Sequence, residues 1–145
     1  MSDSSDPMAR VNDWNRQIIE EFRSNGGKVG GQFAGAPLLL LHTTGAKSGL
    51  EWINPVMYQA VGEDLAVFAS KAGAPTNPDW FHNLVAHPEA SVEVGSETYP
   101  VEARVAEGDE RERIWEKQKV DYPGFAEYEE KTTRQIPVVL LHRVA

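Results

Sequence analysis

The sequence predicts an α+β fold: a small barrel of about six mostly antiparallel strands with flanking helices. Apolar stretches of strand length are joined by glycine-containing turns, which favours hairpin pairing over a doubly wound sheet. Apolar residues also recur at helical spacing near the start, in the middle and late in the chain. The length of 145 residues suits a single domain spanning 1–145.

The first element expected is an amphipathic helix over 7–25. Residues 1–6 are rich in Ser and Asp, and we expect them to be disordered. Asp6 followed by Pro7 is typical of a helix start, and Gly26-Gly27 is typical of a helix end. The apolar stripe of this helix consists of Val11, Trp14, Ile18 and Phe22.

Three strands are expected next. Leu38 to Thr43 is a continuous apolar run, which is typical of a strand buried on both faces. Residues 52–59 alternate in character, and Pro55 among them marks an edge or a bulge. A tight turn beginning at Gly62 then leads into a third strand at 65–70.

The remainder is predicted to contain three helices and three strands. A loop at 71–78 comes first, followed by a short helix that Asn77-Pro78 caps and His87-Pro88 ends. A hairpin of 90–94 with 98–105 follows. The last elements are a helix over 109–120, a short helix starting at Pro123 and a strand over 138–142. The long helix is acidic at its start and basic near its end, as the helix dipole favours.

Composition excludes several classes of function. The chain has no cysteine, so cysteine-ligated zinc, disulfides and a thiol nucleophile are ruled out. Its formal net charge of −8 argues against nonspecific nucleic-acid binding. The longest apolar run, 37–41, is too short to cross a bilayer. The lack of disulfides and of a signal peptide predicts a cytoplasmic protein.

The loop 42–49 is the first candidate binding segment. It reads His-Thr-Thr-Gly-Ala-Lys-Ser-Gly, and its small residues, hydroxyls and one ammonium suit an anion. It is not a phosphate-binding loop of the Walker type, because only three residues separate Gly45 from Gly49. The alternative is a hairpin turn with a solvated Lys47. A second cation, Lys71, follows Ser70 at a strand end and is either a partner at the same anion or a surface lysine.

Two aromatic groups could line a ligand. Trp80 and Phe81 begin a helix and could wall a flat ring, or could simply pack one face of the helix into the core. Tyr122, Phe125 and Tyr128 are spaced by three, so they are expected on one side of a short helix. Their phenols could donate a proton, or the three rings could hold that helix to the barrel.

The histidines predict no metal site. His42, His82, His87 and His142 lie too far apart in the chain for a ligand pattern, and His42 and His142 are expected to be satisfied core or barrel residues. No serine has the context of a hydrolase nucleophile.

In combination, these segments resemble the deazaflavin-dependent nitroreductase family of actinobacteria, which includes quinone reductases. The matching pieces run in order from about Leu38 to Leu141. They are 41–49, Asn54-Pro55 with Tyr58, 70–73, Asn77-Pro78 with 80–84, and 132–137.

The resemblance implies a split β-barrel like those that bind FMN, with reduced coenzyme F420 as the hydride donor. Its phosphate and polyglutamate tail would lie near the 47–49 turn. The residues expected at the coenzyme are Thr44, Lys47, Ser48, Gly49, Pro55, Met57, Ser70, Lys71, Asn77, Asp79 and Trp80. The residues expected at the reaction are Ser70, Tyr122 and Tyr128, with a phenol or solvent supplying the proton.

Three positions depart from the family's common pattern. Ala46 and Trp52 stand where arginines are frequent, so two cations are missing, and Phe125 lacks a hydroxyl that a relative could use. The function predicted is hydride transfer to a flat apolar acceptor: a quinone, an activated enone or a nitroaromatic.

Three alternatives from other classes remain open. One is a carrier of deazaflavin or apolar cargo, and another is an FMN-dependent enzyme on the same barrel. The third is weak peripheral membrane contact through the first helix. A homodimer is among the expected partners.

Overall fold

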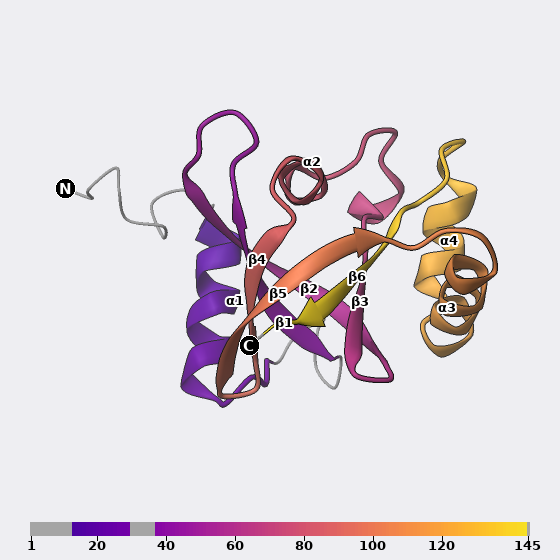
Figure 1. Cartoon of the computed structure of the whole chain (residues 1–145). Helices are drawn as coiled ribbons and strands as arrows, with labels where there is room; N and C mark the ends of the chain where they lie inside the picture. Colours follow the sequence, from indigo (N-terminus) through magenta and orange to yellow (C-terminus); the bar gives the residue numbers. More distant parts are fainter. Residues whose placement is uncertain (1–12, 30–36, 145) are drawn as a thin grey trace.

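The structure, a computed structural model, describes residues 13–29 and 37–144 of the chain. The described strands are β1 (Leu38–Thr44), β2 (Glu51–Val61), β3 (Asp64–Phe68), β4 (Glu89–Val94), β5 (Glu97–Val105) and β6 (Val138–Arg143). The helices are α1 (Asp13–Ser24), α2 (Asp79–Ala86), α3 (Gly108–Asp121) and α4 (Gly124–Glu130), and a 3-10 turn, η3, covers Lys71–Gly73. Figure 1 shows α1 on one side of the barrel, α3 and α4 on the other, and α2 over one end.

The six strands form a closed antiparallel barrel, which confirms the predicted architecture, and their order is β1-β2-β3-β6-β5-β4. β1 with β2, β2 with β3 and β4 with β5 pair as hairpins, and β6 enters between β3 and β5. The ring closes where β1 meets β4. That seam is short, running only from Leu40↔Glu93 to His42↔Ser91, whereas β1 and β2 pair from Leu38↔Met57 to Thr44↔Glu51.

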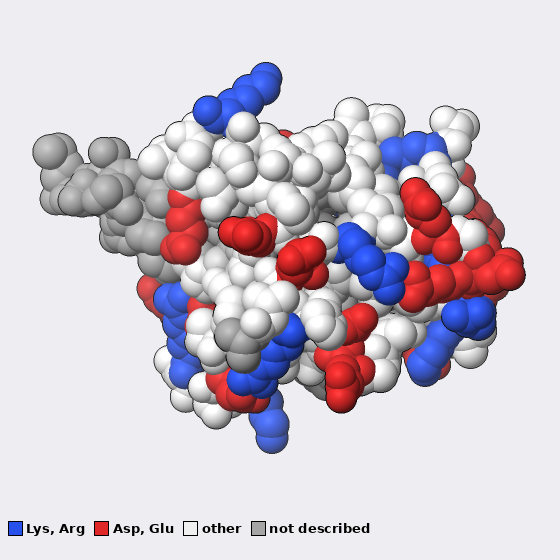
Figure 2. Space-filling view, in the orientation of Figure 1, with Lys and Arg blue, Asp and Glu red and all other residues white. Residues whose placement is uncertain are grey.

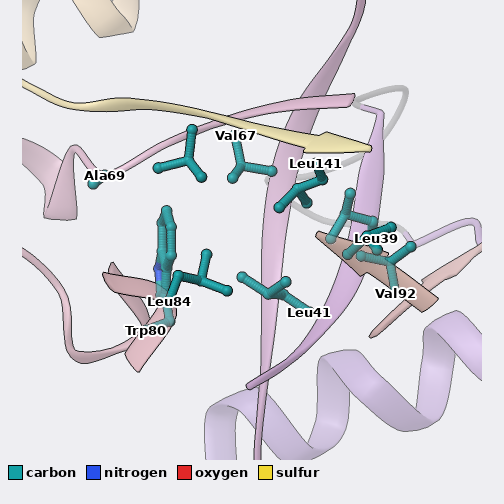
Figure 3. Packing of buried hydrophobic residues seen from close by; sticks show 10 residues of the cluster. Leu39, Leu41, Val67, Ala69, Trp80, Leu84, Val92 and Leu141 are labelled. Carbon is teal, nitrogen blue, oxygen red and sulfur yellow. The ribbon is translucent and has the colours of Figure 1, made fainter. Parts of the chain in front are cut away.

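Side-chain alternation divides the core into three clusters. The barrel interior contains Leu39, Leu41, Val67, Ala69, Val92, Val101, Val139 and Leu141, and α2 closes its end with Trp80 and Leu84 (Figure 3). The outer face of β1 and β2 packs under α1, and the outer face of β3 and β6 packs under α3 and α4. Each large side chain fully buried in this way contributes about 1.5–3 kcal/mol.

Helix α1 ends against the β4–β5 turn. Gly26 and Gly27 both have positive φ, and the Gly27 N–H donates to the carbonyl of Phe22 over 2.8 Å. A Cβ on Gly27 would lie 2.6 Å from the Cα of Gly95, so backbone meets backbone there. The predicted helix end is confirmed, whereas the predicted start at Asp6-Pro7 lies outside the described residues.

The prediction of Asn77 as a helix cap is wrong. Helix α2 begins at Asp79, and Pro78 in the cap position makes no side-chain capping bond. The Asn77 side chain instead accepts a hydrogen bond from Arg134. The third strand also ends at Phe68, before the predicted limit of Ser70, because the chain leaves the ladder there for η3.

Candidate active site

The β1–β2 turn carries the first predicted cation. The Gly45 N–H donates to the Leu50 carbonyl over 2.8 Å, and the Gly49 N–H donates to the Gly45 carbonyl over 3.0 Å. Gly49 has φ of 72°, a conformation that glycine adopts without strain. Lys47 and Ser48 are exposed at the tip of this turn, so both are accessible to a ligand.

Asn83 of α2 fixes this turn to the barrel end. Its Oδ1 accepts from the Ala46 N–H over 2.9 Å, and its Nδ2 donates to Thr43 Oγ1 over 3.0 Å. Asn83 is buried, and a buried amide that satisfies two partners strongly favours one arrangement of them. The sequence contained no sign of this role, because the partners lie on a different element.

The 69–78 loop carries the second predicted cation. Lys71 has φ of 47°, which makes it the one non-glycine residue in the left-handed region within the described chain. Its ammonium donates to Thr76 Oγ1 over 3.3 Å and is otherwise exposed. Strained backbone of this kind costs of order 1–3 kcal/mol and is typical of functional loops.

Helix α4 supports the same loop from below. A Cβ on Gly73 would lie 2.9 Å from Lys131 Cβ and 3.0 Å from the Tyr128 carbonyl, and Gly73 itself has φ of 82°. Only glycine therefore fits between η3 and the end of α4. This contact brings the loop with Ser70 and Lys71 next to the helix that carries Tyr128.

Arg134 anchors the loop from within. Its guanidinium donates to the carbonyls of Ala69, Ser70 and Ala74 over 3.1, 2.9 and 3.0 Å, and to Asn77 Oδ1 over 2.7 Å. Burial lowers the pKa of Arg134 from its ordinary value. Sequence reasoning gave this residue no role, since three of its four acceptors are backbone carbonyls.

Pro55 and Met57 lie on the outer face of β2. Tyr58 donates its N–H to the Pro37 carbonyl over 3.1 Å, so the nitrogen of Pro55 faces the opposite edge of β2. β3 pairs with β2 only from Tyr58 onward, so that edge is free of a strand partner at Pro55. The predicted edge position is confirmed, and the unbroken register excludes a bulge.

Met57, one of the residues predicted at the coenzyme, lies next to the aromatic group. It packs against both outer clusters, and Tyr122 and Tyr128 border one of the same clusters. The Phe125 ring is buried and lies 5.4 Å from that of Tyr128 and 5.6 Å from that of Phe68, centroid to centroid. Phe125 is thus a core residue. Within the described part of the chain, neither tyrosine hydroxyl has a hydrogen-bond partner.

The remaining predicted residues are spread around the same barrel end. Trp80 is 6% exposed and belongs to the barrel interior, while Asp79 is exposed at the start of α2. Thr44 is half-buried at the end of β1. Because β1 ends, β2 begins and β3 ends at this end of the barrel, the turn of Lys47 and the loop of Lys71 lie there on either side of α2 (Figure 1).

The histidines have structural partners. His42 Nε2 lies 2.6 Å from Glu93 Oε2, and His142 Nδ1 lies 2.7 Å from Asp64 Oδ1 on the exposed side of the barrel. Among the described residues, no group of three or more His, Asp and Glu is placed to hold a metal ion. In that same part of the chain, no helix is long and apolar enough to cross a membrane.

Comparison with known proteins decides the family. A family model described as F420H(2)-dependent quinone reductase matches residues 14–143. This chain belongs to the F420H(2)-dependent quinone reductase family. An F420H(2)-dependent quinone reductase of Mycobacterium tuberculosis is 35% identical over 126 residues, which cover 84% of this chain and 85% of that protein.

Solved structures agree with this F420H(2)-dependent reductase family. A structure described as an F420-H2 dependent reductase is 42% identical, covers 73% of this chain and 94% of its own, and superposes with a TM-score of 0.67. A structure described as a domain-swapped dimer is 39% identical, with coverage of 90% and 98% and a TM-score of 0.70. A haem storage protein of Vibrio cholerae shares only the barrel fold, at 16% identity, with coverage of 90% and 91% and a TM-score of 0.58.

The residues present fit the coenzyme that this family uses. An anionic tail needs cations and free donors, and Lys47 and Lys71 are exposed at the same barrel end. Among the described residues, the backbone N–H groups of Ser70 and Lys71 have no protein acceptor. Pro55 and Met57 are half-buried on the outer face of β2, so part of each side chain is accessible to a flat ring.

Proposed function

We propose that this chain transfers a hydride from reduced coenzyme F420 to a flat apolar acceptor of the quinone class. The observation that carries the proposal is the pair of exposed cations, Lys47 and Lys71, at the end of the barrel where β2 begins, with Pro55 further along the outer face of β2. Family membership makes F420H(2) the donor. When bound, the reduced deazaflavin supplies the hydride, and the protein supplies position and electrostatics.

The residues take distinct roles in this proposal. Lys47, Ser48 and Lys71 bind the anionic tail by charge-assisted hydrogen bonds. Ser70, with Pro55 and Met57, orients the ring against β2. Trp80 acts indirectly, because its buried indole sets the position of α2 and hence of Asp79.

The proton required by the reduced acceptor comes from Tyr122, Tyr128 or solvent. Both tyrosines are partly exposed, and among the described residues both phenols are free to hydrogen-bond with an acceptor carbonyl. The surface over α2 is largely uncharged, whereas charged side chains gather around α3 and α4 (Figure 2).

Anaerobic turnover tests the proposal. Purified protein is mixed with F420H(2), and absorbance is followed while menadione, an enone or a nitroaromatic is added. We expect protein-dependent reoxidation. Lys47→Gln and Lys71→Gln should each weaken F420 binding about tenfold, the loss of one charge-assisted hydrogen bond. Lys117→Gln is the matched control, because Lys117 lies on α3 in an exposed pair with Asp121.

The outcomes separate the rival functions. Tight F420 binding without turnover of any acceptor would favour a carrier, a reading that gains support from the two cations missing at Ala46 and Trp52. Failure to bind F420, together with binding of FMN, would overturn the proposal in favour of the flavin alternative.

Assembly and membrane contact are further parts of the proposal. A homodimer is supported by the related domain-swapped dimer. Peripheral membrane contact through α1 has less support, because Ile18 and Phe22 of its stripe are buried against β1 and β2. The side chains of Val11 and Trp14 lie outside the described ones. Vesicle flotation of the full chain and of a chain lacking α1 tests this contact.

A further inference from the structure

Arg134 lies outside the 69–78 loop in the chain and joins both halves of it. Its three nitrogens reach Ala69, Ser70 and Ala74 through their carbonyls and Asn77 through its amide oxygen, at 2.7 to 3.1 Å. Lys71 therefore lies between anchored residues on both sides. A planar guanidinium suits this role because its donors are held in a fixed fork, which an ammonium lacks.

This anchoring determines which way the loop amides point. In a trans peptide the C=O and N–H groups point in opposite directions, and no cis peptide is present among the described residues. Since the carbonyls of Ala69 and Ser70 point at Arg134, the N–H groups of Ser70 and Lys71 point away from it. The left-handed φ of Lys71 is strained, and the contacts of Arg134 on both sides of it hold the backbone in that conformation.

Arg134 also brings a charge that its neighbours do not cancel. All of its acceptors are neutral oxygens, and it forms no ion pair with any described residue. Arg111 offers a contrast. That buried arginine also donates to a backbone carbonyl, that of Ile136 over 2.6 Å, but it pairs with the carboxylate of Glu112 at 2.7 Å.

We propose that Arg134 is a positioning residue for the anionic part of the coenzyme. Its fork holds the Ser70 and Lys71 N–H groups outward, and its uncompensated charge adds to the positive potential at that place. The inference rests on the proposed function, which it deepens by adding a cation that does not itself touch the ligand.

Three variants separate the fork from the charge. Arg134→Gln removes both, and Arg134→Lys keeps the charge but loses the fork. Asn77→Asp keeps the hydrogen bond to Arg134, because the carboxylate is nearly isosteric with the amide, yet cancels the charge. Arg111→Gln is the control for loss of a structural arginine.

The measurements are the F420 dissociation constant, kcat and KM for F420H(2), the melting temperature, and amide hydrogen exchange of 69–77 without coenzyme. For Arg134→Gln we expect faster exchange and a dissociation constant and KM raised about tenfold or more, with kcat at saturation within about twofold. Arg134→Lys should recover part of the affinity and none of the protection from exchange.

Asn77→Asp is the decisive variant. We expect its melting temperature to equal or exceed that of the wild type, since the new ion pair strengthens the anchor. Its F420 affinity should still fall several-fold, with a shallower dependence on salt. Arg111→Gln should lower the melting temperature and leave the F420 affinity of the folded protein unchanged.

Each outcome has a separate meaning. Wild-type affinity in Asn77→Asp would overturn the electrostatic part, and unchanged exchange in Arg134→Gln would overturn the anchoring part. If the wild type binds F420 and Arg134→Gln binds it equally, only this inference fails. If the wild type itself does not bind F420, the proposed function fails first. Should Arg134→Gln not fold, Asn77→Asp and Arg134→Lys still decide.

Discussion

Lys71 combines a strained backbone with an exposed charge, and the two properties can be separated by substitution. Lys71→Gly removes the ammonium and relieves the left-handed strain, whereas Lys71→Ala removes the ammonium and keeps the strain. Relief of about 1–2 kcal/mol is offset by the added chain entropy of glycine, about 0.5–1 kcal/mol. We therefore expect the urea concentration at the unfolding midpoint of Lys71→Gly to equal or exceed that of the wild type.

Both Lys71 variants should lose F420 affinity to a similar degree. Urea titration and F420 fluorescence titration measure the two effects on the same samples. A Lys71→Gly protein that is clearly less stable than the wild type would show that this backbone conformation carries no strain.

The two tyrosines lead to a prediction about proton transfer. If a phenol donates the proton, Tyr122→Phe or Tyr128→Phe should lower kcat by about 10²-fold, the lower end of general acid catalysis. Both side chains pack on the α3–α4 cluster through their rings, so removing the hydroxyls should leave the melting temperature unchanged. Steady-state reoxidation of F420H(2) gives kcat, and single-turnover reoxidation gives the rate constant of the chemical step. Full activity in the double variant would assign the proton to solvent.

At the scale of elements, local chemistry predicted most of the fold. The hairpins at Gly62 and Gly95 and the helix end at Gly26-Gly27 follow from glycines that accept positive φ, which is visible in the sequence. The pairing of β1 with β4 that closes the barrel could not be predicted from local sequence, because it joins residues distant in the chain. The Asn77 cap failed for a similar reason, since Arg134 competes for the side chain from far along the sequence.

In the candidate site, too, local sequence signals predicted some residues, and long-range contacts concealed others. The exposed cations Lys47 and Lys71 were predicted because each follows a strand and precedes small residues. Asn83 and Arg134 were missed because their partners are mainly backbone groups of other elements. Trp80 and Phe125 show the limit of aromatic patterns, since core rings and ligand-facing rings have the same spacing in the chain.

Helix α1 is held to the barrel by a pair that depends on pH. Arg23 donates twice to Glu93, at 3.0 and 2.7 Å, and His42 contacts the same carboxylate. Burial alone would raise the pKa of Glu93, but the hydrogen bonds and charges of Arg23 and His42 outweigh it and lower that pKa. Stability from a lowered carboxylate pKa is present above the unfolded value, about 4.3, and is lost as pH falls through the folded value.

Glu93→Gln should therefore cost about 1 kcal/mol at pH 7, a modest figure because Arg23 is partly exposed. The difference from the wild type should shrink toward zero as pH falls below about 4. Urea unfolding at several pH values measures both. Glu97→Gln is the control, since its pair with Arg143 is exposed and should contribute little at any pH. A penalty that persists in acid would contradict the ionic origin.

At the scale of the whole molecule, the barrel is closed by one short strand pairing. The β1–β4 seam is the shortest described pairing that closes the barrel, and a relative 39% identical is described as a domain-swapped dimer. We predict a homodimer with twice the chain mass of 16.1 kDa. Sedimentation equilibrium measures this, and a monomer across the whole micromolar range would contradict it.

Among the strands of the barrel, amide hydrogen exchange should be fastest along the β1–β4 seam, because the barrel opens there with the fewest broken hydrogen bonds.

The contact between Gly27 and Gly95 also restricts how this lineage can change over evolutionary time. A mutation that replaces either glycine places a side chain on a left-handed backbone. At Gly27 the new side chain also clashes with the main chain of Gly95. Gly27 therefore accepts no side chain while the β4–β5 turn keeps its place, whereas a side chain at Gly95 would meet only the cost of its left-handed φ. Descendants that keep α1 docked should inherit Gly27, and those that lose it should show a remodelled β4–β5 turn or a detached first helix.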